Sequence, residues 1–125
     1  MKKPLFVFEM ANNHMGDLSH GIKIVHELRK ITKKYSQFDF AVKLQLRDDS
    51  FFHRDHIHRK DHKLIKRFTE TRLGKDFIIL IEKIKKNGFM SMCIPWGELV
   101  TNYLIDIKIV KKWICQDLTR FIKDQ

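Results

Sequence analysis

The fold is decided by one N-terminal stretch, Pro4-Leu5-Phe6-Val7-Phe8-Glu9-Met10-Ala11-Asn12-Asn13-His14-Met15-Gly16-Asp17. Residues 4–10 are mostly apolar and rich in β-favouring types, which predicts a buried strand. The Asn, Gly and Asp residues that follow are typical of a turn, and Asp17 and Ser19 are both candidate N-caps. A helix ending near Lys34 is predicted because apolar residues recur at three- and four-residue steps: Leu18, Ile22, Val25, Leu28 and Ile31.

The same order of elements continues after this helix. Residues 40–46 form a second predicted strand, so strand, helix and strand make a βαβ unit whose two strands should be parallel. Residues 47–61 are polar and lack apolar periodicity, which predicts a loop. Helical character resumes over residues 61–71.

A second clear helix and a third strand complete the pattern. The helix follows Gly74 and ends at Gly88, since glycine adopts the left-handed conformation of a C′ residue without steric cost. Residues 89–94 then form the third strand, which Pro95 ends. The apolar face of the helix is predicted to carry Phe77, Leu80, Ile81 and Ile84. The sequence therefore predicts an α/β protein with parallel strands.

The composition limits the class of protein. The chain has 125 residues, enough for one domain, and 25 Lys+Arg against 15 Asp+Glu give a formal charge of +10. This basic excess is spread along the chain rather than gathered in an aromatic-bearing stripe, so no nucleic-acid partner is predicted. The apolar run at residues 77–81 is far shorter than the ~20 residues that span a bilayer, and Glu9 interrupts the N-terminal run, so we predict neither a membrane segment nor export.

Cysteine usage indicates the compartment. Cys93 and Cys115 form neither a disulfide framework nor a metal pair by their spacing. This fits a reducing cytoplasm, in which both are expected to be small buried apolar groups.

Polar residues near the strand ends are the candidate site, because ligands of parallel α/β folds bind at the carboxyl ends of strands. Glu9 lies near the end of the first strand, and Lys43 and Gln45 alternate with apolar residues in the second, so both point to one face. A lysine inside a buried strand requires an anion or a carboxylate nearby. Two interpretations stay open: an ion pair between Lys43 and Glu9, or a cation that awaits an anionic ligand.

The most conspicuous polar segment is rich in histidine and lies within residues 53–62. The spacing H-x2-H-x-H-x3-H could present imidazoles to a divalent metal, but the loop alternates histidine with Arg and Asp and lacks the fixed geometry of zinc motifs. A solvated polar loop is favoured. The histidines are His53, His56, His58 and His62, whereas His20 and His26 belong to the first helix and are expected at its surface.

Four motifs in order resemble the sialic acid synthase family. Residues 6–17 resemble that family's opening, I-A-E-I-G-x-N-H-x-G-D, and residues 41–45, Ala-Val-Lys-Leu-Gln, resemble its second strand, A-V-K-F-Q. Residues 66–73 and 88–96 are similar to later segments, the second of them to a C-T-P-F strand end. The resemblance runs in register from about residue 5 to residue 98.

The resemblance implies a (β/α)8 barrel that condenses phosphoenolpyruvate with an N-acylmannosamine-type sugar and releases phosphate, with a divalent Mn or Mg ion. It implies that Lys43 contacts the anionic groups of phosphoenolpyruvate, that Gln45 lies beside the sugar, and that Glu9 is a polar or acid–base group near the reacting centre. Asn13 and His14 would shape the rim of the pocket. The metal ligands of the family belong to later strands, so none is expected among these residues.

The departures from the family divide the chain. Residues 1–98 are expected to form a partial (β/α)8 TIM-type barrel of about three to four βα units, whereas residues 99–125 diverge, with a candidate strand at 104–110 and a candidate helix at 114–122. Ile94 stands where the family has a threonine whose hydroxyl can contact phosphate. A complete barrel needs about 250 residues, so the chain is expected to be a truncated, inactive fragment of such a synthase.

A non-enzymatic alternative stays open. A partial barrel leaves strand edges unpaired, and such edges favour pairing with another chain. Under this alternative, the chain is an interaction module or a remnant of an enzyme. It could form a homo-oligomer through its open strand edges.

Overall fold

The computed structural model describes residues 2–47, 63–96, 100, 102, 103, 112 and 113. Five sequence predictions lie outside these residues and stay predictions. They concern the loop at 47–61 beyond Arg47, the group of His53, His56, His58 and His62, the strand at 104–110, the helix at 114–122 and the burial of Cys115.

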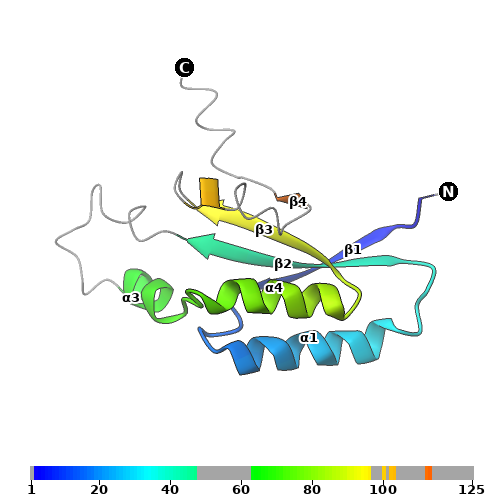
Figure 1. The fold of residues 1–125 in the computed structure, drawn as a ribbon, viewed down its shortest axis with the longest axis horizontal. Coiled ribbons are helices and arrows are strands. Elements are labelled where there is room, and N and C mark those ends of the chain that lie inside the picture. The colour runs from blue at the N-terminus through cyan, green and yellow to red at the C-terminus, as the bar shows by residue number, and fades with distance from the viewer. Residues whose placement is uncertain (1, 48–62, 97–99, 101, 104–111, 114–125) are drawn as a thin grey trace, which may run out of the picture.

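The strands form one parallel sheet (Figure 1). β1 (Leu5–Ala11), β2 (Asp39–Arg47), β3 (Met90–Trp96) and the short β4 (Lys112–Trp113) are neighbours in that order. Each strand is connected to the next in chain order, as expected for successive parallel βα units.

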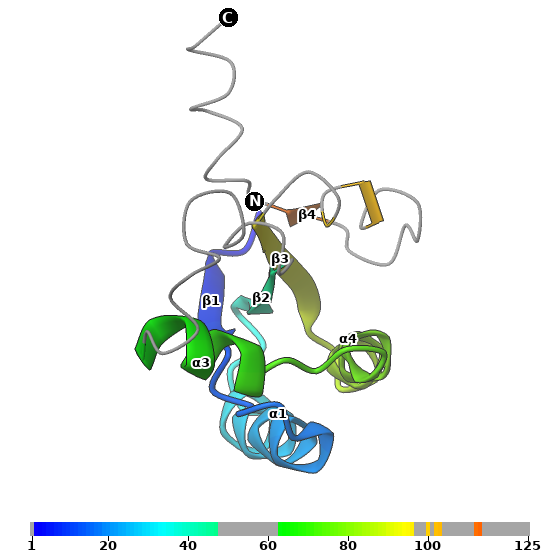
Figure 2. The same ribbon diagram turned by 90° about the vertical axis from the view of Figure 1, so that its left-hand side faces the viewer.

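Two helices cover one face of this sheet. α1 (Leu18–Thr32) and α4 (Asp76–Lys86) lie side by side beneath the strands in Figures 1 and 2. The shorter α3 (Lys63–Glu70) lies instead near the end at which β2 terminates (Figure 1). This position places the end of α3 beside the loop that follows β1.

The core lies between the helices and the sheet. Val42 and Leu44 of β2 are fully buried against it, and alternate residues of the same strand face the other side of the sheet. All four residues predicted for the apolar face of the second clear helix are buried in α4: Phe77, Leu80, Ile81 and Ile84. Removing a side chain of this size from water contributes about 1.5–3 kcal/mol, so this layer holds the strands in register.

The prediction for the apolar face of the first helix, now α1, is wrong at one residue. Ile31 is 57% exposed, whereas its neighbour Thr32 is 3% exposed. Thr32 lies seven residues after the buried Val25, two helical turns away, and Ile31 is rotated by about 100° from that inward position. The Thr32 hydroxyl donates to the backbone oxygen of Leu28 (2.9 Å), which satisfies its burial.

The two ends of the sheet differ in polarity. At the amino end, aromatic rings pack on one another: the Phe8 and Phe40 centroids are 5.8 Å apart, and those of Phe8 and Phe89 are 6.2 Å apart. At the carboxyl end, β2 carries Gln45 and Arg47. Gln45 and Arg47 thus lie at the end of the sheet near α3.

Most of the predicted fold is confirmed. The strands predicted at 4–10, 40–46 and 89–94 correspond to β1, β2 and β3 with parallel pairing, and the α/β class is correct. The prediction that Pro95 ends the third strand is wrong, because β3 continues through Pro95 to Trp96, which pairs with Arg47. Gly88 has φ of +80°, as a C′ residue requires, and Cys93 is a free, buried thiol. The (β/α)8 barrel stays a prediction.

Candidate functional site

The loop after β1 is tightly wound. The β1–β2 register slips between Glu9 and Ala11, and the backbone then takes positive φ at Ala11 (47°), Met15 (56°) and Gly16 (75°). Three short turns follow one another, closed by backbone hydrogen bonds from Asn13 to Met10, Met15 to Asn12 and Asp17 to His14 (2.8–2.9 Å). Residues held in such sparsely populated conformations cluster at functional sites, so this loop is a candidate.

His14 is turned into the protein by this loop. Its side chain is 2% exposed, and its Nδ1 accepts a hydrogen bond from the backbone N–H of Gly16 at 3.0 Å. Burial, with a smaller effect from nearby His20, lowers the pKa of His14 to about 4. The imidazole is therefore neutral at neutral pH and supports the turn. It does not line the cavity described below.

Lys43 and Glu9 form an ion pair across β1 and β2. Their Cα atoms are register partners, and Lys43 Nζ contacts Glu9 Oε2. The Lys43 side chain is 19% exposed and that of Glu9 is 46% exposed. The ion pair foreseen as one of two interpretations is thus present, and a half-exposed carboxylate still leaves the lysine within reach of a competing anion.

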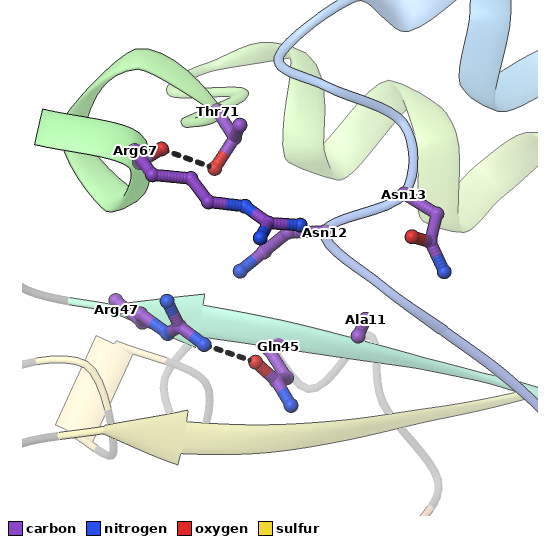
Figure 3. A pocket seen from close by; sticks show the side chains of 7 residues that line it. All are labelled: Ala11, Asn12, Asn13, Gln45, Arg47, Arg67 and Thr71. Carbon is purple, nitrogen blue, oxygen red and sulfur yellow. Dashed lines mark hydrogen bonds between the residues drawn. The ribbon is translucent and has the colours of Figure 1, made fainter. Parts of the chain in front are cut away.

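A cavity of about 250 Å³ opens at the carboxyl ends of β1 and β2 (Figure 3). The loop after β1, the end of β2 and the α3 region enclose it. Two of the predicted site residues, Asn13 and Gln45, belong to its lining, which consists of Ala11, Asn12, Asn13, Gln45, Arg47, Arg67 and Thr71. Lys43 precedes Gln45 by two residues on the same face of β2, so the ion pair adjoins this cavity.

Two arginines in the cavity were not foreseen from the sequence. Arg47 donates to Gln45 Oε1, and its guanidinium lies over the Trp96 ring, 5.2 Å from the centroid. Burial, and then the charge of Arg67, lower the pKa of Arg47. Arg47 is the next residue on the face of β2 that carries Lys43 and Gln45, so extending the strand by one residue would have identified it as a site residue. No local sequence signal identifies Arg67.

Gly16 sets the distance between two walls of the cavity. A Cβ atom at Gly16 would lie 2.8 Å from the backbone oxygen of Glu70, closer than real Cβ atoms come to backbone. The loop that carries Asn12 and Asn13 is therefore packed directly on the end of α3. Thr71, just beyond that helix, donates from its hydroxyl to the Arg67 oxygen (2.9 Å).

The described residues do not fit the divalent metal that the family resemblance implies. Among them, no three His, Cys, Asp or Glu residues lie close enough together to hold a metal ion. We therefore derive no step of the chemistry through a metal. Within the same residues, no helix is both long and apolar enough to cross a membrane.

The described residues form an α/β protein whose parallel sheet carries ammonium, guanidinium and amide groups near the carboxyl ends of β1 and β2, which is where ligands of such folds bind. No family model and no curated protein matches the sequence. Solved structures do match it.

One similar structure is spore coat polysaccharide biosynthesis protein E from Chromobacterium violaceum, at 39% identity over 94% of this chain and 35% of that chain, with a TM-score of 0.81. Another is the N-acetylneuraminic acid (sialic acid) synthetase of Leptospira borgpetersenii serovar Hardjo-bovis, solved in complex with citrate. It is 19% identical over 96% of this chain and 39% of that chain, with a TM-score of 0.73, a likeness that concerns the fold.

Both structures are of the sialic acid synthase family, so the relationship that the four motifs predict is confirmed. The chain spans little more than a third of the length of either protein.

Proposed function

We propose that this chain supplies part of the active site of a sialic acid synthase-type enzyme, which joins phosphoenolpyruvate to an N-acylmannosamine-type sugar through a new carbon–carbon bond and releases phosphate. The observation that carries the proposal is the shared face of β2: Lys43 and Gln45 point to one side of the sheet, next to the cavity at its carboxyl end. The family resemblance of the same two residues supports it.

Lys43 is the proposed ligand of phosphoenolpyruvate. A lysine 19% exposed in a sheet is already desolvated, so an anionic substrate gains more from it than from a surface lysine. Glu9 holds the ammonium group in place when no substrate is bound. The half-exposed Glu9 carboxylate then becomes the polar or acid–base group near the reacting centre.

Gln45 and Asn13 are the proposed sugar contacts. Both line the cavity, and their amides can donate to and accept from sugar hydroxyls. Gln45 is also oriented by Arg47, which donates to its Oε1. The amide NH2 of Gln45 is therefore the group that stays available to a ligand.

The 125-residue chain by itself is proposed to bind phosphoenolpyruvate without condensing it. Condensation requires a held sugar and a neutralised phosphate at about 3–3.5 Å attack distance. Ile94, the register partner of Gln45, offers no hydroxyl for that phosphate.

The test is a calorimetric titration of the 125-residue chain with phosphoenolpyruvate at low salt. We expect Lys43→Ala to weaken binding at least tenfold, because it removes the desolvated cation. Lys23→Ala, which removes an exposed lysine of α1, is the matched control and should change binding less than twofold.

Two results would contradict the proposal. Equal losses from Lys43→Ala and Lys23→Ala would mean that only general charge attracts the ligand. Phosphate release from phosphoenolpyruvate with N-acetylmannosamine and manganese, lost in Glu9→Gln, would show that the chain is catalytic by itself.

A second function rests on a different observation. Within the described sheet, β1 pairs with β2 alone, and three of its residues are exposed to solvent: Leu5 (38%), Phe6 (50%) and Val7 (43%). Such an edge can receive another strand. Pairing with a second chain is therefore the alternative function.

A further inference from the structure

The cavity at the end of β2 has an unusual set of lining groups for a sugar site. Two guanidinium groups, three side-chain amides and one hydroxyl face it, and the lining contains no carboxylate among the described residues. Hydrogen-bond donors therefore predominate. Guanidinium groups bind phosphate and carboxylate oxygens through two parallel N–H bonds, which makes this lining typical of an oxyanion site.

Arg47 is held in place before any ligand arrives. Its guanidinium lies over Trp96 and donates to Gln45, so its orientation is fixed from two sides. A fixed guanidinium loses little conformational entropy when an anion binds. Arg47 is therefore a preorganised donor rather than a mobile surface charge.

Arg67 approaches from a different element. Figure 3 shows Arg67 and Thr71 on one side of the cavity and Arg47 and Gln45 on the other. The two arginines are close enough for the charge of Arg67 to lower the pKa of Arg47. An anion between two like charges relieves their repulsion, so the arrangement favours an anionic ligand over a neutral one.

Lys43 adjoins the cavity but does not line it, whereas Arg47 does. Arg47 is four residues beyond Lys43 on β2, which corresponds to about 13 Å at 3.3 Å per residue. Pockets for drug-sized ligands measure about 300–1,000 Å³, so a cavity of about 250 Å³ suits a monosaccharide-sized molecule.

Resting on the proposed function, in which this cavity receives the sugar, we propose that the cavity beside Lys43 is a second oxyanion site, which binds a phosphate or carboxylate group of a ligand no larger than a monosaccharide. Arg47 and Arg67 contact the oxyanion from opposite walls. Asn12, Asn13 and Gln45 provide the neutral donors and acceptors around it.

The experiment titrates the 125-residue chain with three probes: inorganic phosphate, glucose 6-phosphate and neutral glucose. Binding of both phosphate probes but not of glucose is expected, and Arg67→Gln should weaken the binding at least tenfold. Arg67→Lys, which keeps the charge but loses the two-pronged donor, should give an intermediate affinity. If glucose 6-phosphate binds more tightly than inorganic phosphate, the natural ligand carries its anionic group on a sugar. If the two bind equally, the site recognises the free anion. Both results support the site.

Lys66→Gln is the matched control. Lys66 is the exposed neighbour of Arg67 on α3, is ion-paired with Glu70 and does not line the cavity, so its loss should change binding less than twofold. Equal weakening by Lys66→Gln and Arg67→Gln, or no binding of either phosphate probe, would overturn the proposal.

Lys43→Ala separates this site from the proposed phosphoenolpyruvate site. It should leave glucose 6-phosphate binding within twofold of the unaltered chain while it weakens binding of phosphoenolpyruvate at least tenfold. If Lys43→Ala lost binding of both glucose 6-phosphate and phosphoenolpyruvate, a single site would bind both ligands. That result would overturn the second oxyanion site but not the proposed phosphoenolpyruvate site.

Discussion

At the scale of single residues, the loop after β1 depends on conformations that side chains resist. Ala11, Met15 and Gly16 all have positive φ, and only Gly16 does so without a Cβ atom. His14 stabilises the same loop by accepting from the Gly16 N–H. The loop presents Asn12 and Asn13 to the cavity because these few residues bend the chain back on itself.

Gly16→Ala should destabilise the chain by about 1–3 kcal/mol, because it combines a strained φ with a Cβ atom 2.8 Å from the Glu70 oxygen. Urea denaturation measures the loss. Gly74→Ala is the control, since Gly74 also has positive φ but open space around it. A loss no larger than that of Gly74→Ala would show that the loop and α3 are not tightly packed.

At the scale of elements, α1 begins where one carboxylate satisfies its first backbone donors. Asp17 Oδ1 accepts from the N–H groups of Ser19 (2.7 Å) and His20 (3.2 Å), and from the Ser19 hydroxyl (2.7 Å). Both sequence candidates, Asp17 and Ser19, thus take part, but Asp17 is the N-cap. The same bonds, led by that from the Ser19 hydroxyl, lower the pKa of Asp17.

Asp17→Ala should lower the urea midpoint at neutral pH, because the first N–H groups of α1 lose their acceptor. Asp17→Asn should retain most of the stability, since asparagine caps as well as aspartate.

The effect of pH on these variants has a definite sign. The pKa of Asp17 is lower in the folded chain than in the unfolded one, so its charge stabilises the fold above the unfolded pKa. That stability is lost as the pH falls through the folded pKa. The difference between Asp17→Asn and the unaltered chain should therefore shrink in acid, and a constant difference would contradict the role of the charge.

At the scale of the whole molecule, the described sheet ends at β1, whose outer edge carries exposed Leu5, Phe6 and Val7. Single exposed apolar residues are common, but a run of them along a strand edge is a template for pairing. This feature bears on the alternative function, because a second chain can pair with β1 directly.

Val7→Lys should reduce self-association, because a lysine on an edge strand opposes strand addition. Sedimentation velocity over a range of concentrations measures it. Ile79→Lys, which adds the same charge at a residue 42% exposed on α4, is the control and should have no effect. If both variants reduced self-association equally, the added charge in general, and not the edge of β1, would account for the effect.

The sequence by itself determined the elements and one face of the site. Apolar periodicity is a local property, so alternation in β2 and three- and four-residue steps in α4 were enough to locate the strands, the helix and its buried face. Alternation also placed Lys43 and Gln45 on one side of the sheet. The position of Glu9 opposite Lys43 is a matter of strand register, which the structure shows. The motif resemblance identified the family from the same residues.

Only the tertiary structure decided which polar groups meet. Arg67 lies 20 positions after Arg47 in the chain and reaches the same cavity because Gly16 lets the loop pack against the end of α3. His14 faces inward because positive φ at Met15 and Gly16 reverses the chain there, and Thr32 replaces Ile31 inside because of rotation about the α1 axis. The meeting of Arg47 and Arg67 depends on how close two backbones can come, which is a non-local quantity that residue spacing does not contain.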